Sequence, residues 1–333
     1  MVLVTGATGI LGRVIALELV KRGEKVRACK RLGSNLADVR KSYQNYTSNA
    51  DFYFDQIDWV DLDFNKHHSL YKALQDITDV YHCAAKISFD PKDRDEVLET
   101  GIVCTRNLLR ACLYMPVKKF LFVSSAATLR IDKKGLESQI KDHDSVQMYS
   151  PYVISKYIAE KMVWSAYKEG LNTVIINPAM IIGSGNRQKN SQLLDIFMAD
   201  RITFPGGTSC VDVRDVAKIA ISLIEKNIFG ERFCVSADNV LYKDLAGQVR
   251  NIAGLPKPIL LTKNLLKVLK YFRPLLKVVD HNARFLTDEN IKFICDYQYY
   301  SNKKIKNAIA WNFYPVAESI RFHYGNYLTD KSA

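Results

Sequence analysis

A glycine-punctuated stretch at the start of the chain constrains the fold more than any other feature of the sequence. Residues 2–4 are apolar and predict a short buried strand, and residues 13–22 have the apolar spacing of a helix. Between them lie Gly6, Gly9 and Gly12. A glycine-rich turn alone is a weak signal, but strand, turn and helix in this order are typical of a dinucleotide-binding unit.

Each glycine has its own physical role in such a turn. Gly6 lets the chain turn sharply, Gly9 leaves room for a pyrophosphate, and Gly12 lets the helix pack closely on the strand. The free N–H groups and the positive end of the helix then face the phosphates. We expect the pyrophosphate of a dinucleotide at the turn formed by Thr5, Gly6, Thr8, Gly9, Ile10, Leu11 and Gly12.

Strand and helix signals then alternate through the first half of the chain. Further strands are predicted at residues 25–30, 57–62, 79–85, 119–124, 173–177 and 231–236. Helices are predicted at residues 67–75, 95–114, 152–168 and 213–226. This alternation predicts the α/β class, a doubly wound parallel Rossmann sheet of about seven strands with helices on both faces. Ligands of such a sheet lie at the carboxyl ends of its strands.

Two segments break the alternation. Residues 184–208 and residues 238–333 are mostly helical or rich in turns. We expect them to form a smaller substrate-binding lobe. Residues 1–183, with 209–237 returning to them, would form the nucleotide-binding domain.

The composition favours a cytoplasmic globular protein. The chain has 333 residues, of which 48% are hydrophobic and 25% charged, enough for a large core. Its seven cysteines are scattered without a C-x-x-C pair, which favours reduced thiols over a disulfide framework or a zinc site. We expect no metal. No signal peptide and no apolar run of about 18 residues is evident, so no transmembrane segment is predicted.

The net charge of +12 has two interpretations. A basic chain can attract phosphorylated cofactors, anionic lipid or nucleic acid, but a solvated lysine-rich surface explains the same number. No nucleic-acid-binding module and no aromatic–basic pattern occurs. We therefore expect a small-molecule substrate and no nucleic-acid partner.

Residues 263–279 form an amphipathic pattern. One helical face carries the cations Lys263, Lys267, Lys270, Arg273 and Lys277. The other carries the apolar residues Leu265, Val268, Leu269, Phe272, Leu275 and Leu276. Such a helix either lies on a membrane surface or packs its apolar face on the core, and we expect core packing, with Pro274 ending or kinking the helix.

The residues after the second strand bear on the choice of cofactor. An enzyme that uses NAD usually has a carboxylate about 20 residues beyond the glycines, where it bonds the ribose 2′-hydroxyl. Here no carboxylate is present, and Lys30 and Arg31 stand in its place. A guanidinium binds a phosphate through two hydrogen bonds, so Arg31 favours NADP(H) over NAD(H).

A second constellation predicts acid/base chemistry. Ser125 ends the fifth strand, and Tyr152 and Lys156 follow at a spacing that puts both on one helical face. Ser150 and Pro151 just before them favour a helix start. A nearby ammonium lowers the pKa of a tyrosine, so Tyr152 becomes a usable acid or base while Ser125 holds the substrate oxygen.

The Tyr-x-x-x-Lys spacing is weak evidence by itself. It also occurs at Tyr114, Tyr157, Tyr299, Tyr300 and Tyr327. Tyr152 differs because it opens the helix that follows a serine pair, at the same predicted edge of the sheet as the glycine turn.

Taken together, these motifs resemble the extended short-chain dehydrogenase/reductases. The matching stretches are the TGxxGxxG turn at residues 5–12, Asp61-Leu62, the HxAA of residues 82–85, the serines of residues 123–125, the YxxSKxxxE of residues 152–160 and the NP segment of residues 177–183. The resemblance implies a Ser125–Tyr152–Lys156 catalytic set. It also implies cofactor contacts from Asp61, Leu62, Ala84, Ala85, Tyr152, Lys156 and Pro178.

Within this family the chain is most similar to the dihydroflavonol-reductase-like branch. Residues 26–31 resemble its VRAxVR, and residues 206–217 its GGxxxVDVRDVA. This branch implies an oxidoreductase that transfers a hydride between NADP(H) and a carbonyl or secondary alcohol. A sugar-nucleotide epimerase or dehydratase stays open: its usual arginine is missing before Val211, but Arg187 or Arg201 could bind a diphosphate. A third alternative is a nucleotide-sensing protein without catalytic activity.

Some expectations concern the substrate and the subunit. Lys86, Ser88, Phe89 and Met180 are candidate substrate contacts. The apolar faces of the helices at residues 95–114 and 152–168 either form a homodimer interface or pack on the sheet. Gly101 and Cys104 replace the asparagine and glycine of the NVxGT pattern usual in the family, which leaves open what that position contributes to the cofactor site.

Overall fold

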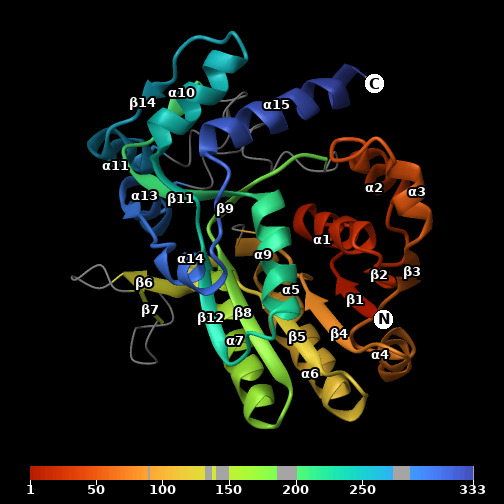
Figure 1. Cartoon of the computed structure of the whole chain (residues 1–333). Helices are drawn as coiled ribbons and strands as arrows, with labels where there is room; N and C mark the ends of the chain where they lie inside the picture. Colours follow the sequence, from red (N-terminus) through yellow and green to blue (C-terminus); the bar gives the residue numbers. More distant parts are fainter. Residues whose placement is uncertain (89–90, 132–136, 140–149, 186–200, 273–285, 333) are drawn as a thin grey trace.

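The computed structural model describes residues 1–88, 91–131, 137–139, 150–185, 201–272 and 286–332 (Figure 1). Several sequence-based expectations fall outside these ranges: Phe89, Arg187, residues 186–200 of the predicted lobe and the part of the amphipathic stretch after residue 272.

Seven parallel strands form the central sheet, in the order β12-β8-β5-β4-β1-β2-β3 (Figure 1). They are β1 (Val2–Thr5), β2 (Val26–Lys30), β3 (Asp58–Asp61), β4 (Asp79–His82), β5 (Lys119–Val123), β8 (Asn172–Pro178) and β12 (Glu231–Val235). The order reverses at β1, which pairs with β2 on one side and with β4 on the other. This is the switch point at which doubly wound sheets bind ligands, and the predicted fold class is confirmed.

Helices cover both faces of this sheet. Side chains of α1 (Ile10–Lys21) and α9 (Val213–Glu225) pack in the core on one face. Those of α4 (His67–Leu74), α6 (Cys104–Tyr114) and α7 (Pro151–Lys168) pack in the core on the other. The strands feed both cores because successive side chains of a strand point to opposite faces.

The apolar faces of α6 and α7 are used within the subunit. Leu108 and Leu109 of α6 and Val163 of α7 are buried in one cluster with Phe120 and Ile175 of the sheet. Packing on the sheet, one of the two alternatives expected for these helices, is therefore what the structure shows. A homodimer remains a prediction.

The helix predicted at residues 95–114 is broken into three pieces. It consists of α5 (Arg94–Leu98), a π-helical turn (Glu99–Val103) and α6. A Cβ on Gly101 would come within 2.6 Å of the Cβ and Oγ atoms of Ser155 on α7. The glycine at this position therefore lets the π-helical turn lie directly against the helix that carries Tyr152.

Two short helices between β2 and β3 have no counterpart in the sequence-based prediction. They are α2 (Leu36–Tyr43) and α3 (Ala50–Asp55). The Asn35 side chain caps α2 by accepting a hydrogen bond from the Ala37 N–H.

A second, smaller sheet lies beyond the central one. It contains β9 (Met180–Ile182), β11 (Gly207–Asp212), β13 (Asp238–Leu241) and β15 (Tyr297–Gln298). We expected residues 209–237 to return to the nucleotide-binding part. In the structure α9 and β12 do so, whereas residues 209–212 are in the second sheet, where β11 pairs with β9, β13 and β15.

Helices and short strands surround the second sheet. The helices are α10 (Tyr242–Ile252), α11 (Lys263–Tyr271), α13 (Asp288–Cys295), α14 (Lys303–Ile309) and α15 (Val316–Ser332). Two-residue strands β10 (Ile202–Thr203) and β14 (Ile259–Leu260) pair with each other, and β6 (Leu129–Ile131) pairs with β7 (Glu137–Gln139). Within the described ranges, no helix combines the length and apolar character needed to cross a bilayer.

The expectation that the apolar face of residues 263–279 packs on the core is wrong for most of α11. Leu266 is buried, but Leu265, Val268 and Phe272 are 44%, 51% and 52% exposed. The helix rests on the protein along one edge of its apolar face and leaves the remainder in solvent.

Substitution of Gly12 by alanine tests the tight packing of α1 on the turn. The new Cβ would lie 2.3 Å from the Gly6 carbonyl oxygen, a backbone atom that cannot rotate away. We expect a loss of about 2 kcal/mol or more in the free energy of unfolding, measured by urea denaturation.

Gly247→Ala is the matched control, because a Cβ on this glycine of α10 meets no atom within 4 Å. This change should raise stability by roughly 0.5–1 kcal/mol. Equal effects of the two substitutions would contradict the packing argument.

Candidate active site

In the glycine turn, backbone segments approach one another more closely than side chains would permit. Gly6 has a φ of +66°, and a Cβ on it would lie 2.7 Å from the Ala84 backbone nitrogen. The Gly9 N–H donates to the Gly6 carbonyl oxygen at 2.9 Å, which closes the turn. Side chains larger than hydrogen at Gly6 and Gly12 would fill the space between the turn, α1 and the loop after β4.

This turn fits the pyrophosphate of a dinucleotide. Gly9 is the N-terminal cap of α1 and has no side chain to satisfy the first N–H groups of the helix. The first turn of α1 also has no acidic side chain. The donors and the positive end of the helix therefore suit an anion, and Gly9 adds no bulk above them.

Arg13 stabilises the glycine turn through hydrogen bonds to backbone carbonyl oxygens. It is 2% exposed, and its guanidinium donates to the carbonyl oxygens of Thr8, Gly9 and Gly185. The last of these lies just after β9, so one side chain joins the turn to the segment that leads out of the central sheet. Sequence reasoning missed this role. A cation directly after the last glycine was the available signal.

A chain of hydrogen bonds connects the turn to the π-helical segment. The Ala84 N–H donates to Thr5 Oγ1 at 3.3 Å, and Thr5 Oγ1 lies 2.7 Å from His82 Nδ1. His82 Nε2 lies 3.0 Å from Thr105 Oγ1, whose hydroxyl donates to the Gly101 carbonyl oxygen at 2.8 Å.

This chain fixes the tautomer of His82. Because the Thr105 hydroxyl uses its proton on Gly101, it can only accept from His82, so Nε2 carries the proton. Nδ1 then accepts from Thr5. Burial lowers the pKa of His82 to about 3, with the Lys156 ammonium adding to the effect, so the ring stays neutral.

Lys30 and Arg31 differ in their surroundings. The Lys30 ammonium is paired with the Asp61 carboxylate across the β2–β3 pair. Arg31 is exposed and opens a tight turn, in which the Ser34 N–H donates to its carbonyl oxygen and Gly33 has a φ of +78°. Among the residues that the structure describes, the Arg31 guanidinium has no hydrogen-bond or ion-pair partner.

Ser125 and Tyr152 are brought together at the carboxyl edge of the sheet. The Ser125 Oγ accepts a hydrogen bond from the Ala127 N–H, which orients the side chain just after β5. Ser150 caps α7 and Pro151 occupies its first turn, so Tyr152 stands at the start of that helix. A hydrogen bond joins the side chains of Ser125 and Tyr152.

Lys156 lies one helical turn further along α7. It is 3% exposed, and its ammonium donates to the Val123 carbonyl oxygen at 2.7 Å while lying 4.8 Å from the centre of the Phe122 ring. Burial lowers its pKa to about 8, although Cys83 and Glu160 oppose the shift. The lysine is therefore held beside the end of β5, the strand that Ser125 follows.

The predicted lowering of the Tyr152 pKa is wrong for this structure. Burial raises the pKa of Tyr152, and the hydrogen bond from Ser125 only partly opposes the shift. The ammonium of Lys156 does not reverse it, because that group faces the Val123 carbonyl. A protonated tyrosine is therefore the stable form.

Glu160 anchors this part of the sheet. Its carboxylate is fully buried and accepts hydrogen bonds from Ser124, Thr128 and Asn177, and it pairs with Arg232 at 3.3 Å. Asn177 in turn donates to the Ser125 carbonyl oxygen at 3.0 Å. One carboxylate on the tyrosine helix thus fixes β5, β8 and β12, and through Asn177 the backbone of Ser125.

The other predicted cofactor contacts lie around this edge. Leu62 is buried and its N–H bonds the Lys30 carbonyl oxygen, so it follows β3 directly. Ala84 and Ala85 are half-buried in the loop after β4, and Pro178 ends β8.

The predicted substrate contacts lie in three different kinds of surroundings. Lys86 is ion-paired with Glu96 and Asp93. Met180 begins β9 and packs against the cluster that contains Tyr242 and Leu245. Ser88 is half-buried in the loop after β4.

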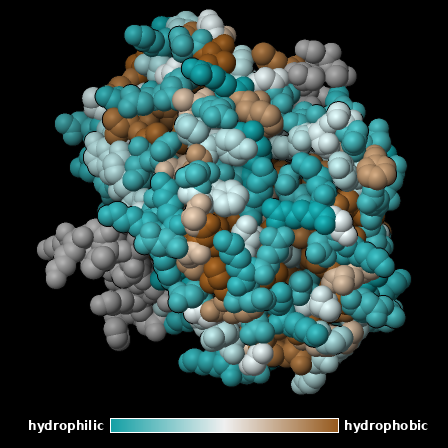
Figure 2. All heavy atoms as spheres, in the orientation of Figure 1, coloured by the Kyte–Doolittle hydropathy of each residue, from teal (hydrophilic) through white to brown (hydrophobic). Residues whose placement is uncertain are grey.

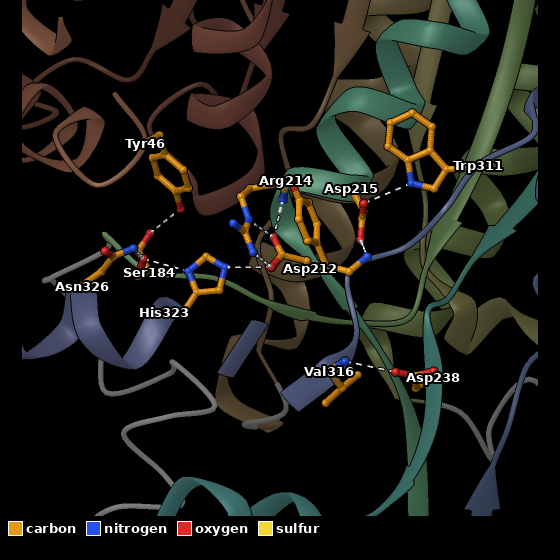
Figure 3. A network of polar contacts seen from close by, with 11 residues as sticks. Tyr46, Ser184, Asp212, Arg214, Asp215, Asp238, Trp311, Val316, His323 and Asn326 are labelled. Atoms are coloured by element: carbon orange, nitrogen blue, oxygen red, sulfur yellow. Dashed lines mark hydrogen bonds and ion pairs between the residues drawn. The ribbon is translucent and has the colours of Figure 1, made fainter. Parts of the chain in front are cut away.

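The VDVRD motif forms a buried network between α9 and the C-terminal helices (Figure 3). Asp212 caps α9 and binds Arg214 and His323, and Asp215 accepts hydrogen bonds from Trp311 and the Tyr314 N–H. Burial alone would raise the pKa of Asp212, but His323 and Arg214 hold it well below the usual range. Ser184 extends the network to Tyr46 and Asn326. The motif therefore joins β11 and the start of α9 to the C-terminal part of the chain.

A family model covers most of the chain. The model of the NAD dependent epimerase/dehydratase family matches residues 2–235, which include the glycine turn, the Ser125–Tyr152–Lys156 set and the VDVRD motif.

Curated relatives include reductases. The chain is 28% identical over 268 residues to sterol demethylase protein B of Methylococcus capsulatus, covering 77% of this chain and 75% of that protein. It is 29% identical over 193 residues to dihydroflavonol 4-reductase of Gerbera hybrida, covering 55% of this chain and 51% of the relative.

Solved structures share the fold. UDP-glucuronic acid 4-epimerase from Bacillus cereus, in complex with UDP-glucuronic acid and NAD, superposes with a TM-score of 0.73. The match covers 99% of both chains at 18% identity, a level at which the likeness concerns the fold alone.

Replacement of Glu160 by glutamine tests its anchoring role. The amide cannot accept on both sides, so either Arg232 or the three polar donors lose their partner. We expect a loss of about 2 kcal/mol in the free energy of unfolding, because removal of one partner from a buried pair is costly and Arg232 is only partly buried.

The control is Glu225→Gln, which removes the partner of Arg22 at the surface and should cost less than about 0.5 kcal/mol. Both changes are compared by chemical denaturation. A Glu160→Gln protein as stable as this control would show that the network does not anchor the sheet.

Proposed function

Because the chain belongs to the NAD dependent epimerase/dehydratase family, it is an NAD(P)-dependent enzyme, and we propose that it is an NADP(H)-dependent oxidoreductase. It would transfer a hydride between the nicotinamide and a carbonyl or secondary alcohol carbon of a small organic substrate. The observation that carries the proposal is the hydrogen-bonded pair of Ser125 and Tyr152 at the carboxyl edge, one helical turn from the buried Lys156.

The bound nicotinamide supplies or accepts the hydride. When a carbonyl is reduced, its oxygen gains negative charge, and the Tyr152 hydroxyl donates the proton that neutralises it. The Ser125 hydroxyl donates a hydrogen bond to the same oxygen and polarises the carbonyl. Since burial raises the pKa of Tyr152, its hydroxyl carries the proton that carbonyl reduction consumes.

Lys156 supports the proton transfer by its charge. After donation Tyr152 is a phenolate, and a nearby ammonium stabilises that anion. Lys156 also would bond the nicotinamide ribose. Its pKa of about 8 means that the positive charge is present at neutral pH and is lost as the pH rises through this value.

Arg31 supports the choice of NADP(H). Lys30 is already paired with Asp61, so its charge is balanced within the protein. Arg31 stands at the end of β2 with its guanidinium exposed, where it would bind the 2′-phosphate of the adenosine ribose.

A reductase is favoured over an epimerase by the second sheet. The side chains of Gly207–Asp212 on β11 are all buried and include no cation that could bind the diphosphate of a sugar nucleotide. Arg201, just before β10, is exposed and remains the described candidate for such a role. The relatives whose names refer to sterols and dihydroflavonols suggest ring-bearing carbonyl compounds as the first substrates to screen.

Substitution of Tyr152 by phenylalanine tests the mechanism. Loss of the general acid should lower kcat for carbonyl reduction by about 10²–10⁴-fold and leave NADPH affinity nearly unchanged. The assay follows NADPH oxidation with a panel of aldehydes, sterol ketones and dihydroflavonols.

Tyr114→Phe is the matched control, because Tyr114 has the same spacing to Lys118 but is 82% exposed. Full activity of Tyr152→Phe would overturn the mechanism. Epimerisation of a UDP-sugar without net consumption of NADPH would replace the reductase by the epimerase.

Substitution of Arg31 by glutamate tests the cofactor preference. We expect the Kd for NADPH, measured by fluorescence titration, to rise about tenfold or more, with little change for NADH. Arg110→Glu changes the net charge equally from an exposed position on α6 and should leave both affinities unchanged. A wild-type protein that binds NADH more tightly than NADPH would contradict the proposal.

A further inference from the structure

Exposed apolar side chains concentrate around α11. Of the 17 large apolar side chains that are exposed among the described residues, seven lie within residues 255–272. Figure 2 shows apolar side chains gathered at the upper left of the molecule, where Figure 1 places β14 and α11. We define the α11 patch as Ile259, Leu260, Leu265, Val268, Tyr271 and Phe272.

The helix geometry separates this patch from the contact with the protein. At 100° per residue, Leu265, Val268 and Phe272 fall within one 60° sector of α11. Leu266, the buried residue of the helix, points about 100° or more away from that sector. The apolar stripe therefore faces outward over the whole length of the helix.

The charge around the patch has one sign. Residues 255–272 contain Lys257, Lys263, Lys267 and Lys270 and no carboxylate. Lys270 is paired with Asp288, and the other three are exposed with no ion-pair partner among the described residues. The lysines of α11 lie along the edge of the helix next to its buried side.

We propose that the α11 patch is a docking surface for an anionic lipid membrane, on which α11 lies parallel to the bilayer plane. An apolar stripe on one face of a helix, with lysines on the opposite face, is typical of helices that lie at the boundary between acyl chains and negatively charged headgroups. The inference is independent of the proposed reaction, since it concerns neither the glycine turn nor the Ser125–Tyr152 pair.

A second copy of the chain fits this surface less well. A twofold interface places the same segment on both sides, so two segments that each carry four lysines and no carboxylate would lie close together. An anionic bilayer supplies the missing negative charge.

The test is sedimentation of the full chain with vesicles. Wild-type protein should bind vesicles of phosphatidylglycerol and phosphatidylcholine, but not vesicles of phosphatidylcholine alone. Val268→Asp with Phe272→Asp should abolish binding. Lys263→Glu with Lys267→Glu should weaken it by more than about fivefold per lysine, because each charge is reversed.

The control variant is Phe52→Asp, a substitution of a 64% exposed residue on α3, a helix that lies on the opposite side of the molecule from α11 (Figure 1). It should bind vesicles like the wild type, and circular dichroism checks that all variants are folded. Failure of the wild type to bind anionic vesicles overturns the proposal. Vesicle binding that survives in the Val268/Phe272 variant also overturns it. So does a wild-type protein that binds no vesicles and forms a concentration-dependent dimer, if the Val268/Phe272 variant does not form this dimer.

Discussion

The contact between the Gly6 carbonyl and Gly12 is the constraint on which the dinucleotide site depends. It brings the first turn of α1 against the end of β1, closer than any side chain would permit. The loop after β4 closes on the same turn through Ala84. The N-terminus of α1 is thereby held at the switch point of the sheet, and no side-chain cap occupies its first N–H groups.

Buried polar groups hold the other parts of the site at this edge. His82 spans from Thr5 to Thr105 in a chain where every proton has an acceptor, so an isolated polar group is not left in the core. Glu160 does the same for three strands with a full set of donors. Such networks stabilise one arrangement of the strands over others, because a shift of a strand would leave a buried charge without partners.

The sequence predicted the central sheet and the location of the site, but not the second sheet. Most strands of the central sheet contain apolar runs, and helical patterns separate them; it is this alternation that indicates a parallel sheet. In the second sheet β9 has three residues and β15 has two, too few for a periodic signal. Gly101 shows another limit of prediction from sequence. The sequence revealed that Gly101 departs from the NVxGT pattern, but only the closeness of Ser155 explains why a side chain is absent there.

Two errors of prediction share one cause, which is that spacing along a helix does not say what the helix faces. The apolar stripe of α11 was expected in the core and faces solvent. Lys156 was expected to lower the Tyr152 pKa and donates to the Val123 carbonyl instead. In both cases the pattern identified the correct face of the helix, whereas the partner of that face was decided by tertiary contacts.

The surroundings of Tyr152 and Lys156 also change how firmly each group holds its proton. In water the two groups hold their protons almost equally, with pKa values of about 10 and 10.4. Burial moves them in opposite directions, raising the pKa of Tyr152 and lowering that of Lys156 to about 8. Tyr152 therefore holds its proton more firmly than a tyrosine in water, whereas Lys156 gives up its proton more readily than a free lysine. In the proposed carbonyl reduction, the oxygen that gains negative charge from the hydride would be the group that accepts this proton.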